Sequence, residues 1–349
     1  MLVQGVARTT RIGVRASRHR WVHGACADAV LGWCWLPIAL SVRALESRLG
    51  TLHGLIGIIF LVSFAHQPLT LGLVYGDPAQ RGAHRRLYTW APLVAAAAIV
   101  VGLNVSLVLV ALMAGLWNAE HTLMQRYGVL RIYGRKVGDR HGPLEKPMLI
   151  AWLVVGISYL GAYVDLDHFV RTLGLGGTNE RAVQLLDHLH LPALVLFWTA
   201  VAIAVTLTVR WCRAELALGA AASRPKHLYA LATLGLVVMV MVDPIAGIAG
   251  YIAAHSIEYF AIVHSSLCKR SDGSPIALAT SSPRRRVTAY LAYFAVIAAV
   301  VYVTLGIWDG RAYAFAVLFL GALHILYDGF VWKLRRPAVA ASLGIPANG

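Results

Sequence analysis

A chain of 349 residues that is 58% hydrophobic and only 13% charged is too apolar for a soluble domain, and it predicts a membrane protein with many crossings. The net charge of +15 does not indicate nucleic-acid binding, because the arginines cluster at the ends of apolar segments and do not interleave with aromatic residues. The four cysteines form no CxxC pair, which argues against a disulfide framework and a zinc knuckle.

The apolar segments predict an all-α, polytopic bundle of about ten transmembrane helices. Two segments, 88–125 and 227–268, are too long for one crossing of a hydrocarbon core about 30 Å thick, so each is expected to cross twice. The expected breaks lie at Gly102 to Asn104 and at Asp243-Pro244. In chain order the crossings are 25–40, 51–75, the pair in 88–125, 148–162, 191–211, the pair in 227–268, 287–308 and 311–332.

The basic residues predict the orientation of these crossings. The positive-inside rule assigns the Arg- and Lys-rich loops to the cytoplasm, including the loop with Arg213, Arg224 and Lys226. Of the 31 Lys and Arg residues, those expected on the other side are Arg43, Arg48, Arg171, Arg181 and Arg311. We therefore expect both termini in the cytoplasm, with a basic segment 1–24, a transmembrane domain 25–332 and a tail 333–349. The expected location is the inner (plasma) membrane, with the lipid bilayer as partner.

Polar side chains inside four of the crossings are the main functional signal. Ionisable groups are costly in lipid, so they usually face the interior of a bundle and mark a site or a pathway. The four helices run toward the cytoplasm at these points, so their histidines are expected at one depth. The residues concerned are His66, Glu120, His121, Gln125, His255, Glu258, Tyr259, His324 and Asp328.

A structural interpretation of these residues stays open. A single histidine in a membrane helix often makes only a hydrogen bond to a neighbouring helix. Glu258 and Asp328 each follow a histidine by about one helical turn, so proton-sharing pairs His255–Glu258 and His324–Asp328 also satisfy the carboxylates.

Imidazoles and carboxylates together favour a first-row transition metal, with iron expected (one or two ions) and zinc or manganese as alternatives. The predicted metal ligands are His66, His121, His255, Glu258, His324 and Asp328. Glu120, Gln125 and Tyr259 are predicted to assist catalysis around them. The sequence contains no haem, flavin or nucleotide motif, so any reductant is expected to be a separate electron donor.

The isolated span histidines and the His255-x2-Glu258 pair resemble, in kind, histidine-rich membrane non-haem iron oxygenases. Membrane desaturases and alkane hydroxylases carry HxxxH and HxxHH boxes, which this chain lacks. The bacterial carotene-cleaving dioxygenases of the Brp/Blh type are similar in having few isolated histidines, although His53-Gly54-Leu55 departs from their HGALD-like opening. The resemblance implies an iron-dependent oxidoreductase in the membrane.

The sequence therefore predicts a metal-dependent oxygenase or desaturase acting on a hydrophobic, lipid-like small molecule. A proton-coupled transporter using the same pairs as relays is the first alternative. A structural membrane subunit is the second. A transporter is expected to carry polar residues toward both faces, whereas the outer halves of these crossings are nearly all apolar, which favours the enzyme.

Overall fold

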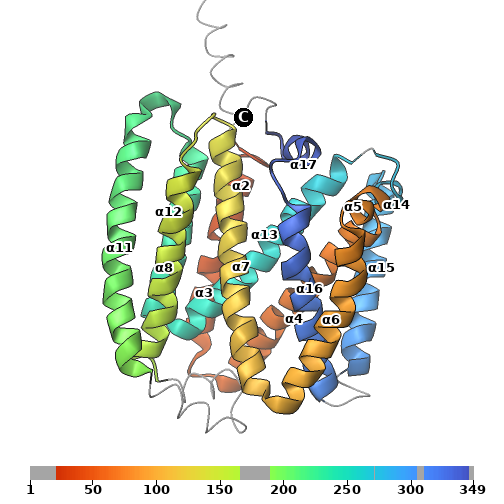
Figure 1. The fold of residues 1–349 in the computed structure, drawn as a ribbon, viewed down its shortest axis with the longest axis horizontal. Coiled ribbons are helices and arrows are strands. Elements are labelled where there is room, and N and C mark those ends of the chain that lie inside the picture. Colours follow the sequence, from red (N-terminus) through yellow and green to blue (C-terminus); the bar gives the residue numbers. More distant parts are fainter. Residues whose placement is uncertain (1–20, 166–188, 271, 305–309, 346–349) are drawn as a thin grey trace, which may run out of the picture. The chain divides into compact units, whose positions relative to one another are not determined.

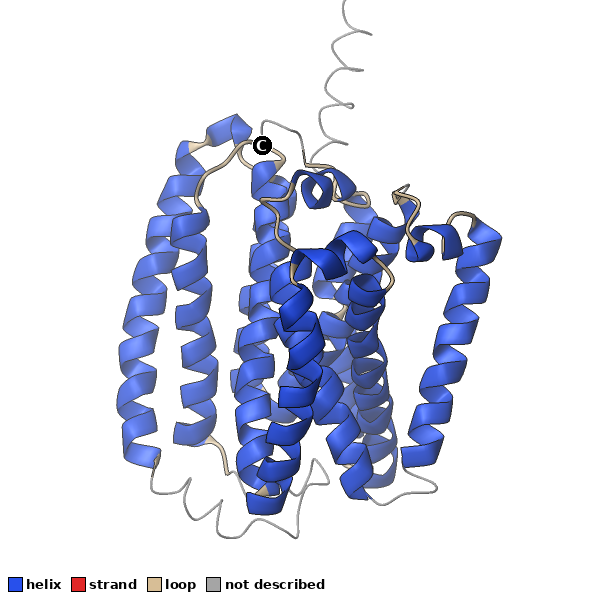
Figure 2. Ribbon diagram, turned by 45° about the vertical axis from the view of Figure 1, so that its right-hand side comes forward, coloured by secondary structure: helices blue, strands red, loops and turns tan. Residues whose placement is uncertain are grey.

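The computed structural model describes residues 21–165, 189–270, 272–304 and 310–345, which form helices joined by turns and contain no β-strand (Figures 1 and 2). Within these residues, nine candidate spans are long and apolar enough to cross a membrane. They are α2 with α3 (Ala25–Trp33 and Trp35–Leu45), α4 (Leu49–Tyr75), α6 (Arg85–Val105), α8 (Gly142–Tyr163), α11 (His190–Ala217), α12 (Arg224–Val242), α13 (Pro244–Cys268), α15 (Pro283–Tyr302) and α16 (Gly310–Val331).

Helix α7 (Leu107–Arg135) adds a further helix of 29 residues, which is longer than the roughly 20 residues that a crossing requires. Four shorter helices lie between or after the long ones: α5 (Pro78–Ala83), η1 (Gly219–Ala221), α14 (Pro275–Ala279) and α17 (Pro337–Ser342). The predicted all-α polytopic fold is therefore confirmed. Residues 1–20 of the predicted basic segment lie outside the described residues.

The helix breaks follow from proline and from side chains that cap helix ends. The first crossing is interrupted at Cys34, because Pro37 has no N–H to donate to the carbonyl of Trp33. The predicted break at Asp243-Pro244 is confirmed, and Asp243 caps α13 by accepting the N–H of Ala246 at 3.0 Å.

The break between α6 and α7 lies at Ser106, slightly later than the predicted Gly102 to Asn104. Asn104 extends the helix, since its amide donates to the carbonyl of Val100 at 2.8 Å. Gly102 allows α6 and α7 to pack closely, because a Cβ at this position would lie 2.5 Å from Cγ2 of Val110 on α7.

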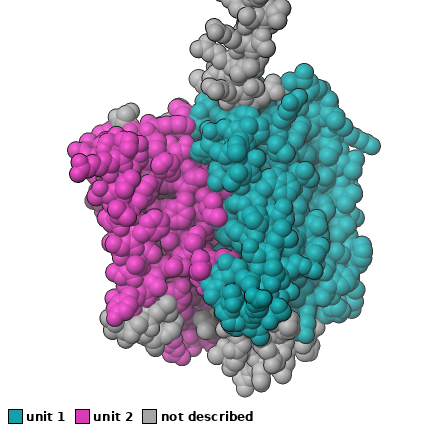
Figure 3. Space-filling model, turned by 180° about the vertical axis from the view of Figure 1, so that it is seen from behind, with its two compact units in different colours: residues 1–56, 122–255, 343–349 teal, residues 57–121, 256–342 magenta. Residues whose placement is uncertain are grey.

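The described helices divide into two compact units, coloured in Figure 3. Unit 1 comprises residues 1–56, 122–255 and 343–349, and unit 2 comprises residues 57–121 and 256–342. The predicted transmembrane domain 25–332 thus contributes to both. Helices α4, α7 and α13 each run from one unit into the other.

Unit 1 is built around α8, which lies beside α11 (Figure 1), while α12 packs on α2 and α8. Its core includes Leu123, Leu130, Met148, Leu149, Trp211 and Tyr229. In unit 2, α16 lies beside α6. The core of unit 2 includes Leu73, Val74, Tyr88, Tyr259, Val263, Leu323 and Tyr327.

Candidate metal centre

Four helices, α4, α7, α13 and α16, bring polar side chains into the buried core of unit 2 through the segments that belong to it. On α4, His66 and Thr70 are four residues apart, and on α16 His324 and Asp328 have the same spacing, so each pair shares a helix face. Helix α7 contributes a histidine and α13 a tyrosine. The exposed fractions are 8% or less for His66, Thr70, His121, Tyr259, His324 and Asp328.

The imidazole of His324 is the centre of this group. Its Nε2 lies 3.2 Å from Nε2 of His66 and 3.1 Å from Nε2 of His121. The His324 ring meets the rings of both neighbours nearly at right angles. Ligand atoms of His121, His324 and Asp328 all lie within 4.8 Å of one another. Three imidazole nitrogens and one carboxylate therefore converge in the interior of unit 2.

The nitrogen separations match those of ligands on one metal ion. Two nitrogens about 2.0–2.1 Å from a shared ion, at the tetrahedral or the octahedral angle, are about 2.8 to 3.4 Å apart. Both separations around His324 fall within this interval.

Thr70 and Tyr259 hold the carboxylate and the central imidazole in place. The hydroxyls of Thr70 and Tyr259 donate to Oδ1 of Asp328 at 2.9 and 2.8 Å. Since the Thr70 proton goes to Asp328, Oγ1 of Thr70 accepts the Nδ1–H of His324 at 2.7 Å. This pattern leaves the Nε2 lone pair of His324 facing His66 and His121, which is the tautomer that a metal ligand requires.

Asp328 is the acidic member of the group. Its Oδ2 lies 3.8 Å from Nε2 of His121 and 3.9 Å from Nδ1 of His324, which places the predicted His324–Asp328 pair together. A carboxylate in hydrocarbon costs about 3 kcal/mol unless it is compensated. A cation held by the neighbouring imidazoles would compensate it.

The other predicted site residues are Glu258, Glu120, His255 and Gln125. Glu258 is buried, but it is rotated about 100° from Tyr259 around α13, and it is not among the ligand atoms that converge in the described part of unit 2. Glu120 is exposed on α7. His255 and Gln125 belong to unit 1, where His255 is buried and the Gln125 amide donates to its carbonyl at 3.1 Å.

Two residues of the group are absent from the sequence prediction. Thr70 contacts His324, Tyr259 and Asp328, and the indole N–H of Trp332 points at the Tyr259 hydroxyl over 3.4 Å. Thr70 could have been predicted from its position four residues after His66, which is the same spacing as that of His324 and Asp328. No comparable spacing marks Trp332.

A second cluster of charged residues lies in unit 1. Ligand atoms of Asp139, His141 and Glu215 converge there, but the ammonium of Lys226 already lies among the carboxylates, 2.6 Å from Asp139 and in contact with Glu215. A lysine ammonium occupies the position that a metal ion would take. This cluster is therefore an ion-pair network rather than a second metal centre.

The network controls the ionisation of Asp139. Burial alone raises the pKa of its carboxyl, but hydrogen bonds from Lys226, from the backbone N–H of His141 and from Arg131 outweigh it and lower the pKa to about 2. Because the folded-state pKa is below the unfolded value of 3.8, this carboxylate stabilises the fold above that pH. The contribution is lost as the pH falls through about 2.

Comparisons of the chain with protein-family models, with curated proteins and with solved structures find no match.

Proposed function

We propose that unit 2 binds a first-row transition metal ion through His66, His121 and His324, with Asp328 completing the ligand set. The observation that supports this proposal is the short distance from Nε2 of His324 to Nε2 of His121, 3.1 Å, and to Nε2 of His66, 3.2 Å. Imidazole with carboxylate suits iron, manganese or zinc, and two histidines with one carboxylate and open positions are typical of non-haem iron enzymes that use oxygen. Iron is the metal we propose.

We further propose that the protein is an oxygenase or desaturase that acts on a lipid-like hydrocarbon in the plasma membrane. The side chains that pack around the group are mainly apolar, among them Leu73, Val263 and Leu323. An apolar, water-poor site suits oxidation of an unreactive hydrocarbon, because water and charged competitors are excluded. The bound metal would supply the activation of oxygen.

The overall reaction requires two electrons from a partner. Hydroxylation places one atom of O2 in a C–H bond and converts the other to water with two electrons and two protons. Desaturation removes two hydrogen atoms from the substrate, and with two electrons and two protons from outside it converts O2 to two molecules of water. Neither the chain's sequence motifs nor its residues provide the reductant, so we propose a separate electron-donor protein.

Product analysis tests this function. The full chain is expressed beside a His324→Ala variant, and the apolar extracts of the two cell populations are compared by mass spectrometry under 18O2. We expect compounds found only with the wild type that are either labelled by one oxygen atom or two hydrogens lighter than their precursors. Identical extracts, from cells in which purified wild-type protein contains iron, would exclude an oxygenase or desaturase acting on the extracted compounds.

A Thr70→Val variant tests how the central histidine is held. Valine keeps the shape of threonine but removes the hydroxyl that bonds His324 and Asp328, so the His324 ring loses the group that fixes its tautomer. We expect metal affinity to fall about 10- to 100-fold, measured by competition with a chelator. Thr199→Val is the control, because Thr199 is exposed and bonds only the carbonyl of Val195 on its own helix. Equal affinities in both variants would contradict the role of Thr70.

A proton relay is the second candidate function, and one observation favours it. Asp328, Thr70, His324 and His121 form a continuous series of contacts suitable for passing a proton. Metal analysis separates the two candidates, since a relay works without a bound ion. Metal-free protein that dissipates a proton gradient in vesicles, with loss of this activity in Asp328→Asn, would favour the relay.

A further inference from the structure

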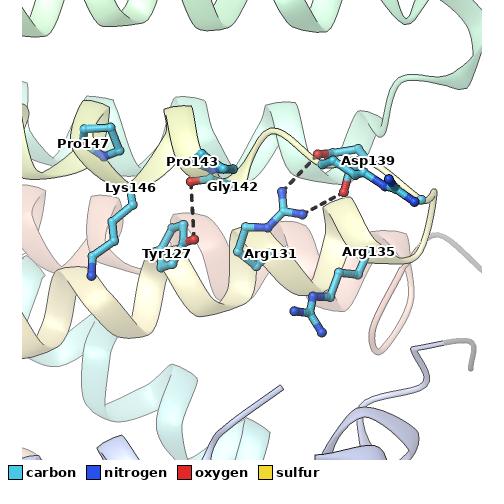
Figure 4. A pocket seen from close by; sticks show the side chains of 10 residues that line it. Tyr127, Arg131, Arg135, Asp139, Gly142, Pro143, Lys146 and Pro147 are labelled. Atoms are coloured by element: carbon cyan, nitrogen blue, oxygen red, sulfur yellow. Dashed lines mark hydrogen bonds and ion pairs between the residues drawn. The ribbon is translucent and has the colours of Figure 1, made fainter. Parts of the chain in front are cut away.

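A second binding site is indicated by a hollow in unit 1, between the end of α7 and the start of α8 (Figure 4). Its volume is about 600 Å³, which is within the range of small-molecule sites. The lining includes Tyr127 and four cationic side chains, which are Arg131, Arg135, Arg140 and Lys146. Figure 4 shows Lys146 extending from α8 beside Tyr127 of α7.

The carboxylate at the base of the hollow already has two cationic partners. Asp139 is the carboxylate among the described lining residues, and it bonds Arg131 at 3.0 Å and Lys226 at 2.6 Å. Arg131 also donates to Glu145 at 2.8 Å. Arg140 and Lys146 are exposed at the rim, and their two positive charges give the rim of the hollow a positive potential.

The position of the hollow adds to its attraction for an anion. It adjoins the first turn of α8, a helix of 22 residues whose N-terminal end carries a partial positive charge. The connection between α7 and α8 is one of the basic loops that the positive-inside rule assigns to the cytoplasmic side. Anionic lipid headgroups lie at that surface, and basic pockets between membrane helices there bind them.

We propose that this hollow binds a phosphate group, and that the phosphate belongs to the headgroup of an anionic phospholipid. Arg140 and Lys146 contact the phosphate from the rim, while Arg131, fixed by its two carboxylates, forms the base. This site lies in unit 1 and is independent of the proposed metal centre in unit 2.

The test uses the full chain in lipid nanodiscs and a double variant, Arg140→Gln with Lys146→Gln. Native mass spectrometry after mild release counts retained phosphatidylglycerol against phosphatidylcholine from mixed nanodiscs. We expect the variant to lose its preference for phosphatidylglycerol by at least about tenfold more than the control, since it removes charge-assisted hydrogen bonds to the phosphate in addition to two surface charges. The control is Arg213→Gln with Arg224→Gln, which removes the same charge at exposed positions of α11 and α12. The control is expected to lose only the part of the preference that two charges at an anionic surface provide in any position.

A second arm distinguishes the source of the phosphate. Inorganic phosphate is titrated into protein in phosphatidylcholine nanodiscs, and protection of the hollow is followed by the reactivity of Lys146 toward an amine-modifying reagent. Protection by inorganic phosphate without retention of phosphatidylglycerol would assign the site to a soluble phosphate and overturn the lipid assignment. Equal losses in the double variant and the control, with no protection by phosphate, would overturn the site altogether.

Discussion

Replacing His324 by alanine is expected to remove the metal from the purified protein. Nε2 of His324 is close to Nε2 of both His66 and His121, and its Nδ1 bonds Thr70. The variant therefore lacks the nitrogen that lies within 3.2 Å of the two other imidazoles. We expect about one iron ion per wild-type chain and less than about a tenth of that in the variant, because loss of one ligand from a four-ligand set also leaves the others misplaced. Elemental analysis of detergent-purified protein measures both values.

Two further variants keep this experiment informative. His264→Ala is the matched control, since His264 is an exposed histidine of α13 and bonds the hydroxyl of Tyr290. Its metal content is expected to equal that of the wild type. If His324→Ala fails to fold, His324→Asn provides a polar side chain in the same buried position. Unchanged metal content in a folded His324 variant would show that the ion is bound elsewhere.

Replacing Lys226 by methionine is expected to destabilise unit 1 strongly. The Lys226 ammonium is fully buried and contacts three carboxylates, lying 2.6 Å from Asp139, 2.5 Å from Glu145 and close to Glu215. Removing one partner from a buried ion pair leaves uncompensated charge and costs about 3–5 kcal/mol. The apparent melting temperature in detergent is expected to fall by about 10 °C.

The controls for this variant separate charge from packing. Lys269→Met removes an exposed lysine, so its melting temperature is expected to stay within about 2 °C of the wild type. Combining Lys226→Met with Glu145→Gln removes one of the three negative charges that Lys226 contacts, and we expect part of the stability to return. A single variant as stable as the Lys269 control would show that Lys226 contributes packing alone.

Much of the fold was predictable because its causes are local in the sequence. A carboxylate followed by proline, as at Asp243-Pro244, caps and begins a helix whatever surrounds it. The interruption at Cys34 was not predicted, although Pro37 provides its cause. The turn at Ser106 was placed slightly early, because Gly102 permits close packing of two helices rather than ending one.

The site was predictable only in part, because packing decides which polar residues meet. His66, His121, His324, Asp328 and Tyr259 were predicted from polar type and depth, and the structure brings them together within unit 2. Depth alone does not give the rotation of a helix. Glu258 and Glu120 therefore have the expected chemistry, but the contacts of the group are made by their neighbours Tyr259 and His121.

The buried ion-pair network around Lys226 could not be predicted from the sequence. In the sequence, Lys226 counts among the basic residues that mark a cytoplasmic loop, together with Arg213 and Arg224. Its burial depends on Asp139 and Glu145 around the start of α8 and on Glu215 near the end of α11. No sequence period relates these positions, so a loop residue and a buried residue have the same appearance in the sequence.

X-ray absorption at the metal edge of the purified protein tests the proposed centre most directly. We expect iron surrounded by imidazole nitrogens and at least one oxygen at about 2.0–2.2 Å, without sulfur, and we expect the imidazole signal to disappear in the His324→Ala variant. A folded wild-type protein that binds no first-row metal after incubation with ferrous, manganous and zinc ions would contradict the centre. So would an ion whose first shell contains sulfur, or one whose spectrum is the same in the His324 variant.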